Sequence, residues 1–334
     1  MRRLLCTLAL AAMPLAAEEP RADFALAIHG GAGTILKENM SPEQEAAYKA
    51  KLGEALDAGV AVLKAGGQAL EAVKAAIVVM EDSPQFNAGR GAVYTWDERH
   101  ELDASLMDGR TLDAGAVAGV TTVKNPILAA HKVMTDSPHV MLSGSGADTF
   151  ARAQGLAQVA NSHFDTESRL QSLRKFKAQQ HKGGDYRAAA PLNGDYKYGT
   201  VGAVALDGHG NLAAGTSTGG MTGKRWGRIG DSPVIGAGTY AENGVCAVSA
   251  TGHGEYFIRY NASADICARI RYQGKEADQA GREVILDRIG RAGGSGGVII
   301  IDGKGNIAMP FNTQGMYRAS HSSRGGRQVA IYGH

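Results

Sequence analysis

The sequence predicts one layered α+β domain in which helices cover antiparallel strands. Three observations support this: amphipathic helical patterns in the first half, short apolar segments rich in β-branched residues, and two tight turns of the same spelling. The chain has 334 residues, 44% of them hydrophobic, which is enough to bury a sizeable core.

The first helix is marked by its start and its end. Ser41 precedes Pro42, and Gln44 follows at the capping-box position, while Gly66 and Gly67 mark the end of the helix. Leu52, Leu56, Val60 and Leu63 recur at helical spacing and predict its buried face. We expect further helices at 69–81, 126–134, 147–154, 256–270 and 276–289.

Apolar, β-rich segments predict the strands. They lie at 24–28, 102–107, 116–123, 200–206, 212–218, 245–251, 298–302 and 307–310. Asp207–Asn211 and Asp302–Asn306 share the pattern Asp-Gly-X-Gly-Asn, and each joins one apolar strand to the next. The 46 glycines gather at the ends of apolar segments, as expected for tight turns.

The N-terminus has the layout of a secretory signal peptide. Arg2 and Arg3 precede an apolar run at 4–12, and small residues end at Ala17. The run is too short for a membrane span. We expect residues 1–17 to be removed and the protein to be exported, either to the periplasm or outside the cell. Loss of both arginines leaves 33 basic against 33 acidic residues, so electrostatic binding to nucleic acid or an anionic membrane is not expected.

Two cysteines, Cys246 and Cys267, remain after removal of the signal peptide. Each lies in an apolar segment, which favours buried free thiols over a disulfide framework. The sequence leaves open whether the two cysteines meet.

Residues 161–199 are polar and charged, and their second half is typical of a solvated linker. They lead to Gly199 and to Thr200 at the start of a predicted strand. Cleavage before Thr200 would free an α-amine able to activate the threonine hydroxyl, since that amine titrates near neutral pH. The dipeptide alone is more typical of an ordinary strand start.

Longer motifs resemble the plant-type asparaginase and isoaspartyl peptidase family of N-terminal-nucleophile hydrolases. They are AIHGGAG at 27–33, FNAGRGAVYTWDERHELDASLMDG at 86–109, the run that begins at Thr200, TGHGE at 251–255 and PFNTQGMYR at 310–318. The resemblance implies a four-layer αββα sandwich that cleaves itself into an α subunit, 18–199, and a β subunit, 200–334. It implies hydrolysis of β-aspartyl peptides and asparagine, and a dimer of such αβ pairs.

The resemblance also implies catalytic roles. Self-cleavage would fall between Gly199 and Thr200, and Thr200 would be the nucleophile. Thr218 would hydrogen-bond near Thr200, and Asn87 would support its terminal amine. Thr251 and Gly252 would donate hydrogen bonds to the developing oxyanion.

A substrate clamp is implied by GRIGDSP at 227–233. A guanidinium at Arg228 suits an α-carboxylate, and a carboxylate at Asp231 suits an α-ammonium. The neighbouring contacts would come from Ile229, Gly230, Thr251, Gly252, His253 and Gly254. We expect His29 to be packed and hydrogen-bonded rather than catalytic.

No organic cofactor is expected. The segment around 80–90 resembles the family's sodium loop, in which main-chain carbonyls coordinate a structural ion. The expected ligands are Met80, Glu81, Ser83, Phe86, Ala88 and Arg90.

Three other interpretations remain to be tested. Gly215–Gly219 matches the G-x-S-x-G motif of serine hydrolases, with Ser217 as nucleophile, but no helical pattern follows it. Glycosylasparaginase shares the implied fold, but it resembles this chain less and carries aspartate where this chain has Gly199. A catalytically silent binding protein for aspartyl compounds would keep only the clamp.

Overall fold

A computed structural model describes residues 21–181 and 199–333. The predicted signal peptide at 1–17 and most of the second half of the predicted linker lie outside the described residues. Among the helices that are described, none has the length and apolar character needed to cross a membrane.

The larger of two sheets has eight strands in the order β12-β11-β1-β5-β6-β2-β3-β4. Neighbouring strands are antiparallel except β3 and β4, and β1 lies between β11 and β5. The strands are β1 (Ala25–Gly33), β2 (Leu102–Asp108), β3 (Ala114–Val120), β4 (Met141–Ser143), β5 (Val201–Leu206), β6 (Leu212–Thr218), β11 (Gly315–Ser322) and β12 (Gly326–Tyr332).

The smaller sheet has four antiparallel strands in the order β10-β9-β8-β7. They are β7 (Thr239–Glu242), β8 (Cys246–Gly252), β9 (Gly296–Asp302) and β10 (Ile307–Ala308). Alanine, valine, leucine, isoleucine and methionine side chains from both sheets form one buried cluster between them, so the sheets pack face to face.

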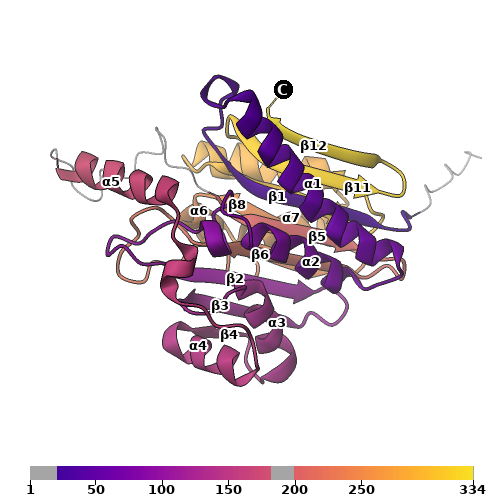
Figure 1. Cartoon of the computed structure of the whole chain (residues 1–334). Helices are drawn as coiled ribbons and strands as arrows, with labels where there is room; N and C mark the ends of the chain where they lie inside the picture. Colours follow the sequence, from indigo (N-terminus) through magenta and orange to yellow (C-terminus); the bar gives the residue numbers. More distant parts are fainter. Residues whose placement is uncertain (1–20, 182–198, 334) are drawn as a thin grey trace, which may run out of the picture.

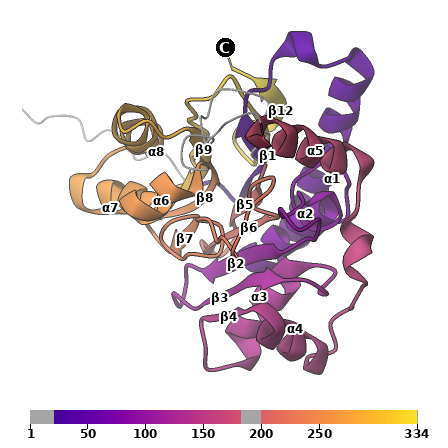
Figure 2. The same cartoon turned by 90° about the vertical axis from the view of Figure 1, so that its left-hand side faces the viewer.

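Helices cover the outer face of each sheet (Figures 1 and 2). On the larger sheet lie α1 (Pro42–Lys64), α2 (Ala69–Glu81) and α3 (Pro126–Asp136), whose buried side chains join the largest core cluster. On the smaller sheet lie α6 (Gly254–Tyr260), α7 (Ala262–Gln273), α8 (Ala277–Arg282) and a π-helix at Glu283–Gly290. These layers confirm the predicted αββα sandwich.

The remaining described helices include one, at Gly144–Ala153, whose Ala147 and Ala151 also join the largest core cluster. They are α4 (Gly144–Ala153), α5 (Glu167–His181) and the 3₁₀ turns η1 (Lys37–Asn39), η2 (Gly89–Gly91) and η3 (Asn161–Phe164). The first part of the predicted linker is thus η3 and α5. Leu173 and Phe176 of α5 pack on Tyr94 in a small separate cluster.

Local sequence signals explain several boundaries. The Ser41 hydroxyl accepts from Gln44 N–H, and the Gln44 side chain accepts from Ser41 N–H, which completes the predicted capping box. In both Asp-Gly-X-Gly-Asn turns the aspartate side chain accepts backbone N–H groups two and four residues later. The shared sequence motif therefore closes both turns by the same hydrogen bonds.

Some predicted elements differ from the observed ones. The helix expected at 256–270 is interrupted at Asn261, which adopts φ 50° between α6 and α7. The helix expected at 276–289 changes from α to π geometry after Arg282. Strands β4, β7, β11 and β12 were not predicted, and the strand expected at 307–310 is only Ile307–Ala308.

The expectation of free thiols is wrong. A disulfide joins Cys246, at the start of β8, to Cys267 in α7, with Cα atoms 5.7 Å apart. The two residues are 21 positions apart in the chain, and packing of α7 against β8 brings them together. The bond ties a helix of the outer layer to the smaller sheet.

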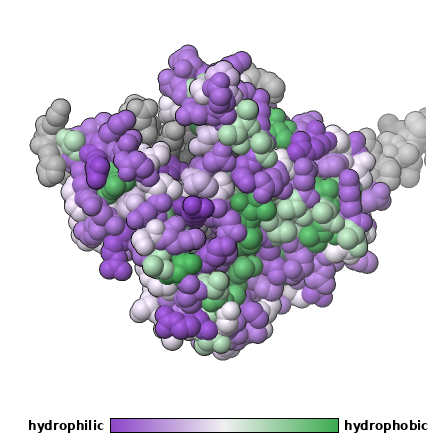
Figure 3. All heavy atoms as spheres, viewed as in Figure 1, coloured by the Kyte–Doolittle hydropathy of each residue, from purple (hydrophilic) through white to green (hydrophobic). Residues whose placement is uncertain are grey.

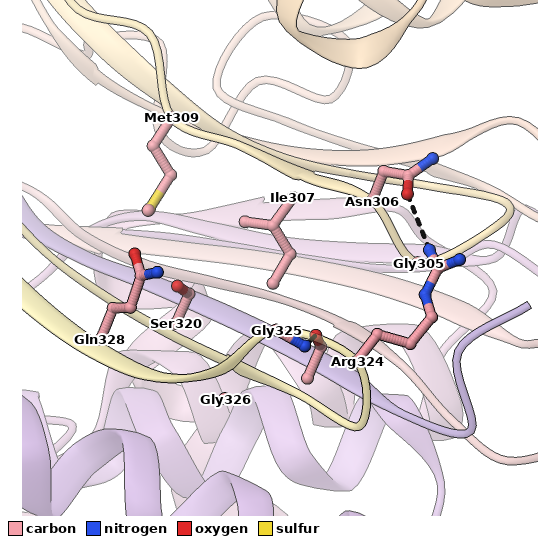
Figure 4. Close-up of a pocket in the computed structure, with 10 residues that line it drawn as sticks. Gly305, Asn306, Ile307, Met309, Ser320, Arg324, Gly325, Gly326 and Gln328 are labelled. Carbon is pink, nitrogen blue, oxygen red and sulfur yellow. Dashed lines mark hydrogen bonds between the residues drawn. The ribbon is translucent and has the colours of Figure 1, made fainter.

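The surface is mainly polar on the face of Figure 3, and hydrophobic residues gather near α1 and α2. At one end of the sandwich a groove of about 430 Å³ lies between β10 and the β11–β12 hairpin. Figure 4 shows Ile307 and Met309 on one side of this groove and Ser320 and Gln328 on the other, with Arg324 hydrogen-bonded to Asn306 at its mouth.

Candidate active site

Thr200 lies just before β5, in the middle of the larger sheet, and is 7% exposed. The Asp207–Asn211 turn closes the β5–β6 hairpin as predicted, and Val201 pairs with Ser217. This register places Thr218, the last residue of β6, beside Thr200.

Hydrogen bonds converge on the peptide bond before Thr200. The Thr200 hydroxyl donates to Thr218 Oγ1 at 3.1 Å, and the Thr218 hydroxyl donates to the Gly199 carbonyl at 3.2 Å. Asn87 Nδ2 donates to the same carbonyl at 2.6 Å. In this uncut chain two donors therefore polarise the carbonyl adjacent to the Thr200 hydroxyl.

Asn87 is fixed by two further bonds. Its Oδ1 accepts from Val93 N–H at 2.9 Å, and its Nδ2 also donates to the Gly220 carbonyl at 2.7 Å. A Cβ atom at position 199 would lie 2.9 Å from Asn87 Cβ. Glycine at 199 therefore allows the close approach of Asn87 to the bond before Thr200.

Thr251 and Gly252 end β8 at the same end of the sandwich. Thr251 Oγ1 accepts from Ala32 N–H at 3.3 Å, which leaves its own proton available to donate. Gly252 has φ 148°, and a Cβ there would lie 2.4 Å from the Ser295 carbonyl, so only glycine fits. The pair therefore provides a hydroxyl donor on a constrained turn.

Arg228 is bound by a residue that the sequence reasoning did not select. Its Nε and Nη2 atoms each lie 2.9 Å from a carboxylate oxygen of Glu255. Burial alone would raise the pKa of Glu255, but hydrogen bonds from His253 and Arg228 lower the pKa overall. Glu255 lies in the motif TGHGE, but nothing in the sequence indicated that it pairs with Arg228.

Asp231 lies 4% exposed beside this ion pair. Burial raises the pKa of Asp231 to about 7, against the opposing effect of the Arg228 charge. Within the described residues its Oδ2 atom has no hydrogen-bond partner. A buried carboxylate oxygen without a donor is costly, and an α-ammonium group would supply the missing donors.

Glycines leave space between the two charged groups. A Cβ at Gly254 would lie 2.8 Å from Asp231 Oδ1 and 3.0 Å from Arg228 Nη2. A Cβ at Gly230 would lie 2.7 Å from Arg228 Nη1. Of the other predicted contacts, Ile229 is 42% exposed, and His253 immediately precedes α6 with its ring 3.2 Å from Glu255.

The predicted sodium loop follows α2. Met80 and Glu81 end that helix, and Ser83, Phe86, Ala88 and Arg90 continue into η2. Cβ atoms at Gly89 and Gly91 would lie 2.3 Å from the Glu81 carbonyl and 2.1 Å from the Phe86 carbonyl. The loop therefore winds tightly around its own carbonyl oxygens, which fits a hard cation. The carbonyls of Met80 and Ala88 already accept N–H groups from within the loop.

Ser217 does not have the surroundings of a serine nucleophile. It is fully buried within β6, and its hydroxyl donates to Glu81 Oε1 at 2.6 Å. The segment from Gly219 to Gly238 contains no helix. The strand–turn–helix geometry that G-x-S-x-G requires is therefore missing here.

Comparisons with known proteins identify the family of this chain. A family model described as asparaginase matches residues 22–331. The chain is 52% identical to an isoaspartyl peptidase of Salmonella typhimurium over 88% of this chain and 94% of that protein. It is 52% identical to the isoaspartyl peptidase of Escherichia coli, over 88% and 91% of the two chains. It is 41% identical to a probable isoaspartyl peptidase/L-asparaginase 2 of Arabidopsis thaliana, over 92% and 99%. This chain belongs to the asparaginase family.

Proposed function

We propose that this chain is a self-cleaving amidohydrolase that acts on β-aspartyl (isoaspartyl) peptides and L-asparagine through Thr200. The contact of the Thr200 hydroxyl with Thr218, beside a Gly199 carbonyl that Asn87 and Thr218 both bind, carries the proposal. The relatives named isoaspartyl peptidase support the substrate class.

Self-cleavage begins with attack of Thr200 Oγ1 on the Gly199 carbonyl carbon. The Gly199 oxygen becomes an oxyanion that Asn87 Nδ2 and the Thr218 hydroxyl stabilise. The C–N bond breaks, and the Thr200 nitrogen takes the hydroxyl proton and leaves as an amine, so that an ester remains. Water hydrolyses the ester to a Gly199 carboxylate and a free Thr200 hydroxyl. The products are the proposed subunits, 18–199 and 200–334.

Turnover then uses the freed amine as the base for the Thr200 hydroxyl. The hydroxyl attacks the side-chain carbonyl of the aspartyl group, and the Thr251 hydroxyl and the Gly252 N–H stabilise the oxyanion. The leaving amine takes a proton and departs, as ammonia from asparagine or as an α-amine from a β-aspartyl peptide. Water attacks the acyl enzyme, releases aspartate and restores Thr200.

The proposed clamp, Arg228 and Asp231, binds the zwitterionic end of the aspartyl group. Arg228 binds the α-carboxylate, and Asp231 binds the α-ammonium with its otherwise unpaired Oδ2 atom. Because Glu255 occupies two nitrogens of Arg228, the Nη1 side that faces Gly230 is the side left for the substrate.

Sodium in the Met80–Arg90 loop is part of the proposal. The carbonyl oxygens of Glu81 and Phe86 fit such an ion, which would stiffen the loop that carries Asn87. Dialysis against a sodium-free potassium or Tris buffer tests this through thermal stability: a fall in Tm that sodium alone restores is expected, and an unchanged Tm would remove sodium from the proposal.

Export and assembly are also proposals. The Cys246–Cys267 disulfide supports an oxidising compartment and hence removal of residues 1–17. A dimer of αβ pairs rests on the family resemblance. Fractionation of the expressing cells tests export, and analytical ultracentrifugation tests assembly, with a single αβ mass as the contrary result.

Intact mass and N-terminal sequencing of the purified protein test self-cleavage. We expect two chains, one of which begins at Thr200, and a Thr200→Ala control that stays whole. Release of amine from β-aspartyl-leucine, of ammonia from asparagine, and of sugar amine from glycosylated asparagine then ranks the substrates. Preference for the glycosylated compound would favour glycosylasparaginase, and binding without release from cleaved protein would favour a binding protein.

A further inference from the structure

His29 touches the nucleophilic residue from inside the sandwich. It follows Ala25 and Ala27 on the inner face of β1 and is fully buried. Its Nδ1 lies 2.8 Å from the Thr200 carbonyl, and its Nε2 lies 2.9 Å from Ser249 Oγ. A Cβ at Gly202 would lie 2.3 Å from His29 Nε2, so glycine there makes room for this contact.

The contact continues as a line of buried hydroxyl groups. Ser249 Oγ lies 2.7 Å from Thr216 Oγ1, Thr239 Oγ1 lies 2.6 Å from Thr216 Oγ1, and Ser105 Oγ lies 2.7 Å from Thr239 Oγ1. All four side chains are fully buried. They come from β8, β6, β7 and β2, so the line joins both sheets through an otherwise apolar interior.

The far end of this line reaches the clamp segment. Ser105 Oγ lies 2.5 Å from the carbonyl of Ser232, the residue after Asp231. The line of His29, Ser249, Thr216, Thr239 and Ser105, here called the polar line, thus connects the main chain of the nucleophile to that of the substrate clamp. Buried polar networks that are fully satisfied favour one arrangement of the elements that they join.

Proton counting fixes the protonation of the His29 end of the polar line. The Thr200 carbonyl can only accept, so His29 Nδ1 must carry a hydrogen. Burial lowers the pKa of His29 to about 3, so the ring is neutral and Nε2 must accept from Ser249. Each hydroxyl has one proton, so Ser249 has none left for Thr216. The Thr216 hydroxyl lies 2.7 Å from Ser249 Oγ and 3.0 Å from the Gly238 carbonyl and can donate to one of them, while Thr239 donates to Thr216.

We propose that His29, held in its Nδ1–H tautomer by Ser249 and the hydroxyls behind it, is a positioning residue that fixes the main chain of Thr200. The inference rests on the proposed role of Thr200. After self-cleavage Thr200 is the first residue of its chain, and no peptide bond precedes it. Its carbonyl is then held by His29, and the β5–β6 ladder begins only at Val201.

The tautomer can be observed directly. The cleaved wild-type protein, labelled with ¹⁵N-histidine and compared with His29→Asn for assignment, should show His29 as a neutral ring with its hydrogen on Nδ1 between pH 5 and 8. A charged ring, or a hydrogen on Nε2, would overturn the inference. This reading does not depend on turnover, so it separates the inference from the proposed function.

Two substitutions of His29 test the contact itself. The amide nitrogen of asparagine can occupy the Nδ1 position, whereas that of glutamine falls near Nε2. We expect His29→Asn to keep kcat within about tenfold of wild type and His29→Gln to lose about a hundredfold, as displacement of a reacting group does. Rates are taken per cleaved chain. Equal loss in both variants would show that His29 only fills space.

Ser249→Ala tests the polar line with a matched control. Ser263 in α7 is also fully buried, and its hydroxyl donates to the Ala237 carbonyl at 2.7 Å, but it lies outside the line. We expect Ser249→Ala to lower kcat about tenfold with KM within a factor of two, and Ser263→Ala to leave kcat unchanged. Equal effects of the two variants, or a change confined to KM, would refute a positioning role for the line.

Discussion

The two ends of the sandwich contain buried aspartates in glycine-rich turns, but these aspartates differ in how fully their carboxylate oxygens are hydrogen-bonded. At the end where β5 finishes, Asp207 accepts four hydrogen bonds, from Ala69, His209 and Asn211, and Asp302 accepts three from its own turn. At the end where β5 begins, Asp231 has one oxygen without a donor among the described residues, and burial raises its pKa to about 7.

The difference separates aspartates whose oxygens are bound within their turns from one whose Oδ2 atom has no donor among the described residues. The turn end, with Asp207, Asp302 and the nearby Cys246–Cys267 disulfide, is satisfied within the chain. The Thr200 end contains this buried oxygen of Asp231, which is expected of a site that binds charge. Changes at the first end should therefore affect stability, and changes at the second should affect chemistry.

Thr200→Ala should have the largest effect. Without the hydroxyl, neither self-cleavage nor acyl transfer can occur, so the chain should stay whole and release no amine. Intact mass and a β-aspartyl-leucine assay measure both. A cleaved, active Thr200→Ala protein would end the comparison by showing that the chemistry lies elsewhere.

Asp231→Asn should come next, with kcat/KM lowered by about a hundredfold or more because the α-ammonium loses its counter-charge. The stability of the Asp231→Asn protein, in contrast, should increase relative to wild type. The folded protein keeps the Asp231 proton up to a pH of about 7, which is the raised pKa, while the unfolded chain loses it near 3.8. The free energy of unfolding of the wild type therefore falls as pH rises from about 4 to 7. Denaturant titration should show Asp231→Asn gaining stability relative to wild type over that range. A pH-independent difference would contradict the assigned environment.

Cys246→Ser with Cys267→Ser tests the turn end. Loss of the disulfide should lower the free energy of unfolding by about 3 kcal/mol, the usual effect for a loop of this size. Guanidinium titration measures it. Activity at 25 °C should be retained, and a loss of kcat in folded protein would show that the two ends are coupled.

Asp207→Ala should have the smallest effect, a loss of about 2 kcal/mol from the buried N–H donors left without acceptors. The β5–β6 hairpin should keep its register, and kcat should stay within twofold. Thermal unfolding and steady-state assays together measure this. If Asp207→Ala impaired turnover as much as Asp231→Asn, the satisfied aspartates would have to be counted with the site.

The sequence predicted elements whose signals are local. The capping box at Ser41 and the two aspartate turns depend on residues within four positions, and both are observed. The partners of Thr200 came from the family resemblance, and the hairpin register places Thr218 beside Thr200 as expected. The sandwich likewise followed from the resemblance together with alternating patterns.

Features that depend on distant packing were missed. Strand β11 contains small and polar residues, such as Ser320 and Ser322, because its inner face lines the groove at the turn end, and hydrophobic alternation therefore fails there. The disulfide depends on how α7 lies on β8. The pairing of Glu255 with Arg228 could not be predicted, because it depends on how the loop that carries Arg228 packs against α6.

The position of β1 between β5 and β11 has a consequence for the proposed enzyme after cleavage. A strand of the first product is then hydrogen-bonded on both sides to strands of the second, so the pieces are interleaved rather than merely docked. Folding of the precursor is a first-order event, but refolding of the cut protein requires two molecules to meet, so its recovery depends on concentration. The native state is reached by a single chain, and the cleaved protein cannot refold by that route. The lifetime of the cleaved enzyme would therefore be set by how slowly it unfolds.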